Sequence, residues 1–449
     1  MKYDGVAWKP SDNVFNDFKN MVISHEVLLA VTNFMASYRE RVRPVNRVRI
    51  ADLGAFNLCF RMVFEDGFSS LLRFPCPGRV MFPKKKVQNE VAMMTYLQQN
   101  TKIPVPKIIH HGTREDSPAG LGPFILMEYV EHASNLATQL RAPGYQRGDR
   151  PFLDPDIEEE KLEFFYSQIA DILLEFSKPS FDTIGSLLVQ LGNFPPKMLP
   201  NTPFATASSY YQSLSETEFL HLVTQRNDAV DSEPDCRSKY VARRLFCKLA
   251  AESRLHNHTM STSGLFKLFC DDLRPTNILL DDSMKIIAVI DWEFTYTAPA
   301  EFASMPPWWL LLEMPKEWAR GVSDWTRTYQ PRLESFLRVL KRQEDTAIAN
   351  KALAESRRIS GRMRESWDHG ELWVNYGARK SWAFDAVWPI LDAKFFGGVM
   401  APDQYNSPHS EERMELLDVG GREALGPFVQ KKLEDSKQRK LDDWDEILA

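Results

Sequence analysis

Carboxylate and amide side chains gather in one short segment of this 449-residue chain, Leu268–Phe294, which reads LFCDDLRPTNILLDDSMKIIAVIDWEF. Asp272 and Asn277 lie five residues apart, and Asp291 ends the second of two apolar runs. If the two runs pair as a hairpin, Asn277 and Asp291 come to the same end of it. Carboxylate and amide oxygens are hard donors, and Mg²⁺ usually takes only one or two carboxylates together with water and phosphate. The spacing therefore indicates a magnesium site, with Asp272 placed to orient an attacking hydroxyl.

The D-x4-N spacing, the hairpin and the I-D-W-E segment together resemble the phosphotransferase family of aminoglycoside phosphotransferases and choline kinases. The strings DDLRPTNILLDD, VIDWEFTYTAPAEF and PPWWLLLE are most similar to its fungal branch. The resemblance implies a protein-kinase-like fold and phosphoryl transfer from ATP, or from GTP, with Mg²⁺. It further implies Asp272 as the catalytic base and Asn277 and Asp291 as metal ligands. Arg274 falls where kinases often carry a lysine that touches the moving phosphate, and Glu293 is expected to contact the metal or one of its ligands.

One position departs from the family pattern. Members usually carry a histidine two residues before the catalytic aspartate, and this chain has Cys270 there. That histidine mainly packs and hydrogen-bonds within its loop, so we expect its loss to be tolerated and Cys270 to be a buried, unreactive thiol. Asp271 is a second carboxylate directly before Asp272. Only Asp272 has the five-residue spacing to Asn277, which selects it as the base.

The elements upstream predict a small lobe of strands around one helix. Short β-like runs fill residues 48–75, with an Asp66-Gly67 turn between the second and third runs, which is a strong hairpin signal. A helix over residues 86–100 follows, and Pro104 lies beyond its end. Two more β-like runs cover residues 107–110 and 123–130. This order favours an antiparallel sheet plus one helix.

In the resembling family this lobe binds the nucleotide. The candidate phosphate loop is Leu53-Gly54-Ala55-Phe56-Asn57, although a single glycine is equally typical of a plain turn. Arg73 takes the position of the kinase lysine on the third strand, and its guanidinium can bind phosphate in bidentate fashion. Glu90 is the expected ion-pair partner of Arg73. Backbone groups of the hinge-like segment are expected to meet adenine: Glu128, Tyr129 and Val130. The run Lys84, Lys85 and Lys86 is interpreted as a solvated helix start.

The remaining sequence is predominantly helical in pattern, with a clear apolar stripe over residues 157–177. We predict an α+β, protein-kinase-like two-lobe fold with a helical N-terminal extension (1–47) and an N-lobe (48–131). A larger, mainly helical C-lobe (132–320) follows, with an acceptor-side insert and the catalytic loop. A C-terminal helical extension (321–449) completes the chain, and its charged tail from Lys431 onward is expected to fray.

Composition narrows the class of protein. Lys and Arg total 55 against 61 Asp and Glu, a formal net charge of −6, which disfavours a general nucleic-acid binder. No apolar run approaches the roughly 18 residues of a membrane span. Five widely spaced cysteines without a C-x-x-C pair favour a reducing compartment, and we expect a cytoplasmic protein. The oligomeric state stays open.

Two features favour a small molecule over a protein as the acceptor. The A-P-A-E segment starts only seven residues after Asp291, too few for a peptide-docking loop. Roughly 130 residues separate Glu131 from the catalytic loop, and in the resembling family such insertions help to build the acceptor pocket. The predicted activity is phosphoryl transfer to a small-molecule hydroxyl. The alternative is a catalytically silent, kinase-like module that binds a nucleotide or a partner, which Cys270, Arg73 and the single-glycine loop favour.

Overall fold

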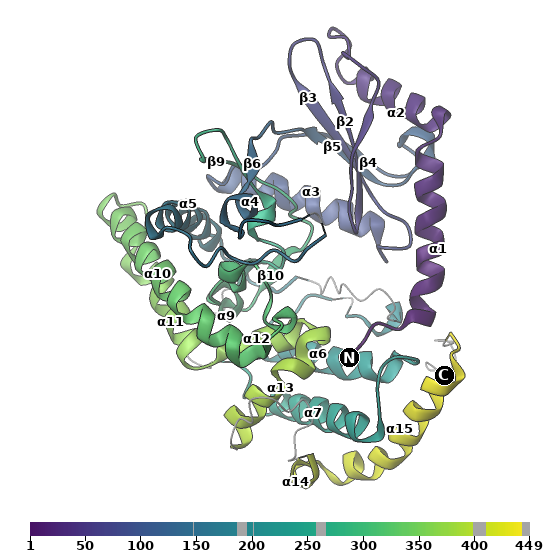
Figure 1. Cartoon of the computed structure of the whole chain (residues 1–449), viewed down its shortest axis with the longest axis vertical. Coiled ribbons are helices and arrows are strands. Elements are labelled where there is room, and N and C mark those ends of the chain that lie inside the picture. Colours follow the sequence, from purple (N-terminus) through teal and green to yellow (C-terminus); the bar gives the residue numbers. More distant parts are fainter. Residues whose placement is uncertain (147, 186–194, 201, 257–265, 398–409, 442–449) are drawn as a thin grey trace. The chain divides into compact units, whose positions relative to one another are not determined.

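The computed structural model describes residues 1–146, 148–185, 195–200, 202–256, 266–397 and 410–441 (Figure 1). The chain forms two compact units. The sheet unit comprises Trp8–Gln139 and Cys270–Thr295, and the helical unit comprises Met1–Ala7, Leu140–Phe269 and Tyr296–Ala449. The boundaries of these units differ from those of the four segments predicted from the sequence. The division into four domains therefore stays a prediction. The Cys270–Thr295 segment thus folds with the N-terminal strands.

The sheet unit is built on a five-stranded antiparallel sheet in the order β1-β2-β3-β5-β4. The hairpin predicted from Asp66-Gly67 is confirmed, because β2 and β3 pair along their whole length. Gly67 has a φ of +83°, a left-handed backbone that glycine adopts without steric cost. The strands are β1 (Arg49–Leu53), β2 (Asn57–Val63), β3 (Ser69–Pro75), β4 (Ile108–Gly112) and β5 (Phe124–Glu128).

Helices α1 (Gly5–Val22), α2 (His25–Ser37) and α3 (Pro83–Asn100) complete this part of the unit. Val31 of α2 is fully buried in a core that includes Phe60 of β2 and Phe124 of β5. Ser24 caps α2 by accepting a hydrogen bond from the backbone N–H of Val27. The predicted helix α3 is confirmed, and it begins three residues earlier than expected because Pro83 is well suited to the first helical turn. The α+β class and the antiparallel sheet with one central helix are therefore correct.

The Cys270–Thr295 segment contains the predicted hairpin. Strands β8 (Ile278–Leu280) and β9 (Ile286–Val289) pair antiparallel, and β6 (Ser134–Asn135) adds a third strand beside β8. The Asp281 side chain closes the turn by accepting hydrogen bonds from the backbone N–H groups of Ser283 and Lys285. A single-turn helix, Pro275–Asn277, precedes β8.

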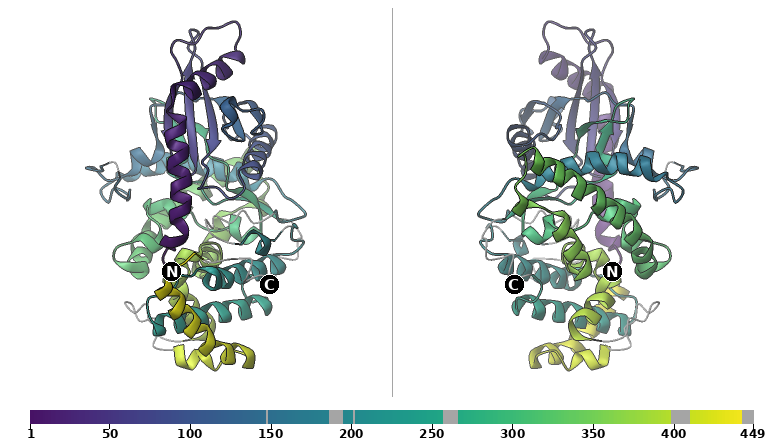
Figure 2. Two further views of the ribbon diagram at one scale, coloured as in Figure 1. Left: turned by 90° about the vertical axis from the view of Figure 1, so that its right-hand side faces the viewer. Right: turned by 90° about the vertical axis from the view of Figure 1, so that its left-hand side faces the viewer.

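The helical unit is mainly α-helical. Helices α6 and α7, drawn in teal, lie side by side (Figure 2), and α5 lies along α10, where Arg338 of α10 contacts Glu163 of α5. Its longer helices are α5 (Glu159–Ser177), α6 (Ala207–Thr224), α7 (Glu233–Ala251), α10 (Gly321–Ala349), α11 (Ser360–Asp368), α12 (Glu371–Arg379), α13 (Ser381–Phe396) and α15 (Val419–Gln438). Its shorter elements are α9 (Ala300–Ala303), α14 (Ser410–Met414) and the paired strands β7 (Lys267–Cys270) and β10 (Thr295–Ala298), whereas α4 (Leu136–Leu140) lies at the end of the first segment of the sheet unit.

Helix α15 corrects the prediction of a frayed tail from Lys431. The helix continues to Gln438, and Val429 and Lys432 are buried. The Lys432 ammonium donates a hydrogen bond of 2.7 Å to the carbonyl oxygen of Gln225. A charged residue in this tail therefore supplies a helix–loop contact, since its aliphatic stem can be buried while its amine finds acceptors.

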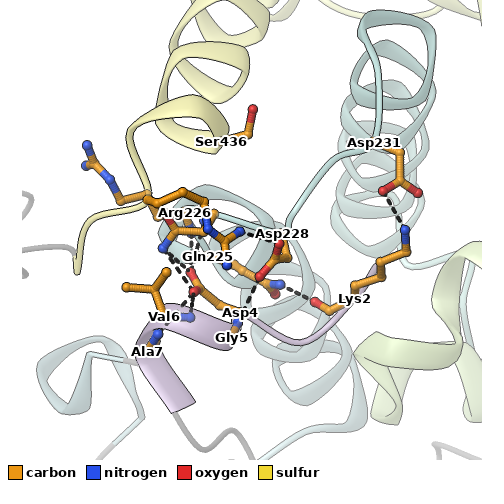
Figure 3. Close-up of polar contacts among 12 residues, drawn as sticks. Lys2, Asp4, Gly5, Val6, Ala7, Gln225, Arg226, Asp228, Asp231 and Ser436 are labelled. Atoms are coloured by element: carbon orange, nitrogen blue, oxygen red, sulfur yellow. Dashed lines mark hydrogen bonds and ion pairs between the residues drawn. The ribbon is translucent and has the colours of Figure 1, made fainter. Parts of the chain in front are cut away.

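The first residues of the chain are held on the helical unit by polar contacts (Figure 3). The Asp4 carboxylate accepts hydrogen bonds from the backbone N–H groups of Val6 and Arg226. The backbone N–H of Gly5 donates to the Asp228 carboxylate, and Lys2 pairs with Asp231 at 2.8 Å. This network joins the start of α1 to the loop between α6 and α7. No helix among the residues described is both long and apolar enough to cross a membrane.

Candidate active site

Arg73 occupies the centre of a buried charge cluster in the sheet unit. It lies on β3, and its guanidinium forms an ion pair with Glu90 of α3 through Nη2. Nη1 of the same side chain lies 3.2 Å from Oδ1 of Asp291, which follows β9. The side chains of Arg73 and Glu90 are only 10% and 2% exposed. Strand β3 thus places one cation between a helix carboxylate and the carboxylate at the end of the hairpin, as the sequence predicted for Arg73 and Glu90.

Burial and like charges shift the pKa values of these groups. Burial, with Glu293 next in importance, raises the pKa of Asp291 to about 7, despite the opposing effect of Arg73. Burial also raises the pKa of Glu90. Burial by itself lowers the pKa of Arg73, but the neighbouring carboxylates outweigh it and raise that pKa, so the guanidinium stays charged. The cations of this cluster do not fully neutralise its carboxylates. The remaining negative charge would stabilise a further cation bound there.

The loop before β8 holds Asp272 in a fixed orientation. The side-chain amide of Asn277 donates to both the backbone oxygen and Oδ2 of Asp272, each at 2.9 Å. Nε of Arg274 lies 2.8 Å from Oδ1 of Asp272. Both carboxylate oxygens of Asp272 therefore have a neighbouring donor or cation. The five-residue spacing allows the hydrogen bonds from Asn277 to Asp272, because the single-turn helix folds Asn277 back onto Asp272.

The hairpin brings Asn277 and Asp291 to the same end, as predicted. The backbone N–H of Ile290 donates 2.9 Å to the carbonyl oxygen of Asn277, which continues the β8–β9 pairing by one step beyond Ile278 and Val289. Asp291 has a φ of +66°, a left-handed backbone that aspartate tolerates better than most residues. The chain thus turns at Asp291 immediately after the ladder.

These residues fit a divalent cation of the Mg²⁺ type. Since Asn277 uses its NH₂ group on Asp272, its Oδ1 is left as the acceptor atom of that amide, with Thr276 Oγ1 3.5 Å away. Asp291 supplies a carboxylate from the neighbouring position. Within the described ranges, no group of three or more His, Cys, Asp or Glu side chains is placed to hold a metal ion. An amide oxygen with one carboxylate is nevertheless the partial ligand set that Mg²⁺ takes when phosphate and water supply the rest.

The loop containing Gly54 is a tight turn between β1 and β2. The backbone N–H of Gly54 donates 2.9 Å to the carbonyl oxygen of Asn57, and the carbonyl of Phe56 accepts from the backbone N–H of Cys76. The hinge-like residues begin at Glu128, the last residue of β5, whose backbone N–H donates to the carbonyl oxygen of Lys107, and the N–H of Tyr129 donates to that of Ser69. The nucleotide contacts expected of these segments stay predictions.

Two residues beside this cluster are Lys86, which sequence reasoning placed in solvent, and Asn57, which it named only as the last residue of the candidate phosphate loop. The interpretation of Lys84–Lys86 as a solvated run is wrong for Lys86, whose side chain is 3% exposed and contacts Glu293 at 2.8 Å. Asn57 donates to the same Glu293 oxygen. The helical stripe carried the signal, because Lys86 lies one turn before Glu90 on the buried face of α3. Lys84 and Lys85 are exposed, as predicted.

Cys270 is buried, and its environment agrees with an unreactive thiol. Only 8% of the residue is exposed, and burial raises the pKa of the thiol far above its usual value. All five cysteines are free thiols.

Comparisons with known proteins give the following similarities. No protein-family model matches the chain. Clavilactone A biosynthesis cluster protein Y of Ampulloclitocybe clavipes is 24% identical over 309 residues, which cover 65% of this chain and 71% of that protein. A solved macrolide 2'-phosphotransferase type I has 12% identity and a TM-score of 0.44, over 81% of this chain and 93% of the other. An aminoglycoside phosphotransferase in complex with AMP-PNP and hygromycin B has 12% identity and a TM-score of 0.40, over 90% and 98% of the two chains.

Proposed function

We propose that this protein is a Mg²⁺-dependent phosphotransferase that moves the γ-phosphate of ATP, or of GTP, to a hydroxyl of a small molecule. The observation that carries the proposal is Arg73, which contacts both Glu90 and Asp291 in one buried cluster of the sheet unit. The same compact unit holds Asp272, oriented by Asn277. Protein kinases hold a nucleotide with the same chemical parts, a strand cation paired to a helix carboxylate and an aspartate–asparagine pair at the metal.

Each residue has a role that follows from its contacts. Asp272, held by two neighbours, accepts and aligns the acceptor hydroxyl, and positioning of this kind supplies much of the rate in phosphoryl transfer. Asn277 and Asp291 hold the metal ion, which when bound offsets negative charge on the phosphate oxygens. Arg73 donates to the phosphates of the nucleotide. Arg274, whose side chain is 41% exposed, reaches the transferred phosphate.

The adenine ring is assigned to the end of β5 and the two residues after it. The backbone N–H groups of Glu128 and Tyr129 are used within the protein, by Lys107 and Ser69. Base recognition therefore falls to their carbonyl groups and to the backbone of Val130. The turn containing Gly54 covers the phosphates.

A small acceptor is favoured by the short path after Asp291. Strand β10 begins at Thr295, only four residues later, so the chain re-enters regular structure without a long loop. A protein kinase uses a long activation segment at this point to hold its peptide. A small molecule needs no such segment.

The proposal is tested by thermal unfolding with ATP, with and without Mg²⁺, in the wild type and Asp291→Asn. Asp282→Asn, an exposed change in the turn of the same hairpin, is the matched control. ATP at about 100 times its dissociation constant should add roughly 2.7 kcal/mol of stability, a shift of a few degrees. In the wild type and in Asp282→Asn, we expect ATP to raise the melting temperature more with Mg²⁺ than without it. In Asp291→Asn this Mg²⁺-dependent increase should be lost. No shift in the wild type would refute a nucleotide site.

The second candidate is a silent module that binds nucleotide without transferring phosphate. Its support is that Arg73 is already engaged by two carboxylates and that Cys270 replaces the family histidine. An assay for transfer of radiolabelled phosphate from ATP to each of a panel of hydroxyl compounds separates the two candidates. Transfer by the wild type but not by Asp272→Asn supports the phosphotransferase. Mg²⁺-dependent binding with no transfer to any compound supports the silent module.

A further inference from the structure

A closed polar triangle lies beside the charge cluster in the sheet unit. The Lys86 ammonium lies 2.8 Å from Oε2 of Glu293 and donates 2.9 Å to Oδ1 of Asn57. Nδ2 of Asn57 in turn donates 2.8 Å to the same Glu293 oxygen. Each member therefore contacts the other two. We call these three residues the Lys86 triangle.

Burial makes the triangle sensitive to the loss of any member. The side chains of Lys86 and Glu293 are 3% and 1% exposed. Taking such charges out of water costs several kcal/mol per ion, which is offset only when the ions are paired and hydrogen-bonded. Oε1 of Glu293 is buried and has no hydrogen-bond partner among the residues described, so both Lys86 and Asn57 contact the carboxylate through Oε2. The geometry of the pair is consequently tightly specified.

The three members come from the three segments assigned to the phosphates and the metal. Asn57 closes the β1–β2 turn through its carbonyl oxygen, which accepts from Gly54. Lys86 lies one turn before Glu90 on α3. Glu293 lies two residues after Asp291. The aromatic pair Phe56–Phe294, with ring centroids 6.0 Å apart, packs next to the triangle and joins the same turn to the same segment.

We infer that the Lys86 triangle is a positioning device, which sets the β1–β2 turn and α3 against the metal-binding carboxylate so that the phosphates of the nucleotide meet a preformed site. The inference rests on the proposed function. It assigns Glu293 a role through Lys86 and Asn57, both of which contact its Oε2. It also predicts which part of the nucleotide is affected, namely the phosphates and not the base.

The decisive variants change the triangle without leaving an unpaired buried charge. Lys86→Met/Glu293→Gln removes both charges together, and Asn57→Ala opens the triangle at its least buried member. Lys85→Met is the matched control, since it makes the same change at an exposed neighbour on α3. Circular dichroism checks that each variant is folded, and Asn57→Ala carries the test if the double variant is not.

The measurement is the dissociation constant of Mg²⁺–ATP and of adenosine for each protein, by calorimetry. We expect Kd for Mg²⁺–ATP to rise about tenfold or more in Asn57→Ala and the double variant, equivalent to about 1.4 kcal/mol. Kd for adenosine should change less than about twofold, and Lys85→Met should match the wild type in both. A residue that only stabilises the fold would weaken both ligands alike.

The outcomes separate this inference from the proposed function. If the wild type binds Mg²⁺–ATP and the triangle variants bind it equally well, or lose adenosine to the same extent, the positioning role is wrong and the proposed function stands. If the wild type binds no nucleotide, both are overturned. A selective loss for Mg²⁺–ATP supports both.

Discussion

Replacing Arg73 with methionine should destabilise the protein far more than the same change at an exposed arginine of the same sheet. The Arg73 guanidinium contacts Glu90, whose side chain is 2% exposed, and Asp291, whose side chain is 25% exposed. Methionine keeps much of the aliphatic stem but leaves both carboxylates without this cation. Removing one partner of a buried ion pair costs about 3–5 kcal/mol, because the remaining charge stays desolvated. We expect a loss of that size.

A second substitution should return part of the loss. Glu90→Gln alone costs less than Arg73→Met, since Arg73 keeps its contact with Asp291. The double variant Arg73→Met/Glu90→Gln also removes the charge of Glu90, the more deeply buried of the two carboxylates that Arg73→Met leaves without a cation. The double variant should therefore be more stable than the sum of the single changes predicts, by about 0.5–3 kcal/mol, the usual coupling between residues in contact.

Urea unfolding followed by circular dichroism and tryptophan fluorescence measures these differences. Arg49→Met, an exposed change on β1, is the control and should stay within about 0.5 kcal/mol of the wild type. The reasoning is refuted if Arg73→Met costs no more than Arg49→Met. It is also refuted if the two changes at Arg73 and Glu90 add without coupling, because the guanidinium and carboxylate would then not depend on each other.

Three further predictions follow from the charges and thiols. Burial raises the pKa of Glu218 on α6 to about 8, against 4.5 in the unfolded chain. The folded state therefore binds this proton more tightly than the unfolded state does. The resulting stability is fully present below pH 4.5 and is lost as the pH rises through about 8. Glu218→Gln should flatten the fall in melting temperature across this range, whereas the exposed Glu216→Gln should not. Asn277→Asp should cost about 1–3 kcal/mol in thermal unfolding, because it removes the donor to Asp272 and sets two carboxylates together. Iodoacetamide should label the thiols only after unfolding, as counted by mass spectrometry, because burial raises the pKa of every cysteine: Cys76, Cys236 and Cys247 to about 11, Cys59 to about 12, and Cys270 further.

Local signals were strong enough to predict the strands and helix of the sheet unit. The Asp66-Gly67 turn, the alternation in β2 and the apolar stripe of α3 each depend on neighbours a few residues away. The hairpin that joins Asn277 to Asp291 was predicted for the same reason, since two apolar runs around a polar turn leave few other pairings. The strand cation Arg73 and its partner Glu90 came from the family resemblance, and the structure brings them into contact.

The Lys86 and α15 predictions failed for a common reason. Charged residues in a run, such as Lys84–Lys86 or the tail from Lys431, are usually solvated, and sequence alone does not say which member meets a buried partner. Lys86 is buried because Glu293, more than 200 positions away, lies beside it. Lys432 can be buried because the carbonyl oxygen of Gln225 accepts a hydrogen bond from its ammonium group.

The sequence by itself determined the order of strands and helices, the pairing of the β8–β9 hairpin and the spacing that folds Asn277 onto Asp272, because these depend on contacts within about 15 residues along the chain. Only the tertiary structure decided which charges are buried and which carboxylate each cation contacts. Arg73 and Glu90 lie far along the chain from Asp291, and the burial that raises the pKa of Asp291 most arises only where these segments meet. Desolvation and pairing of charges are properties of that meeting point, and no local pattern encodes them.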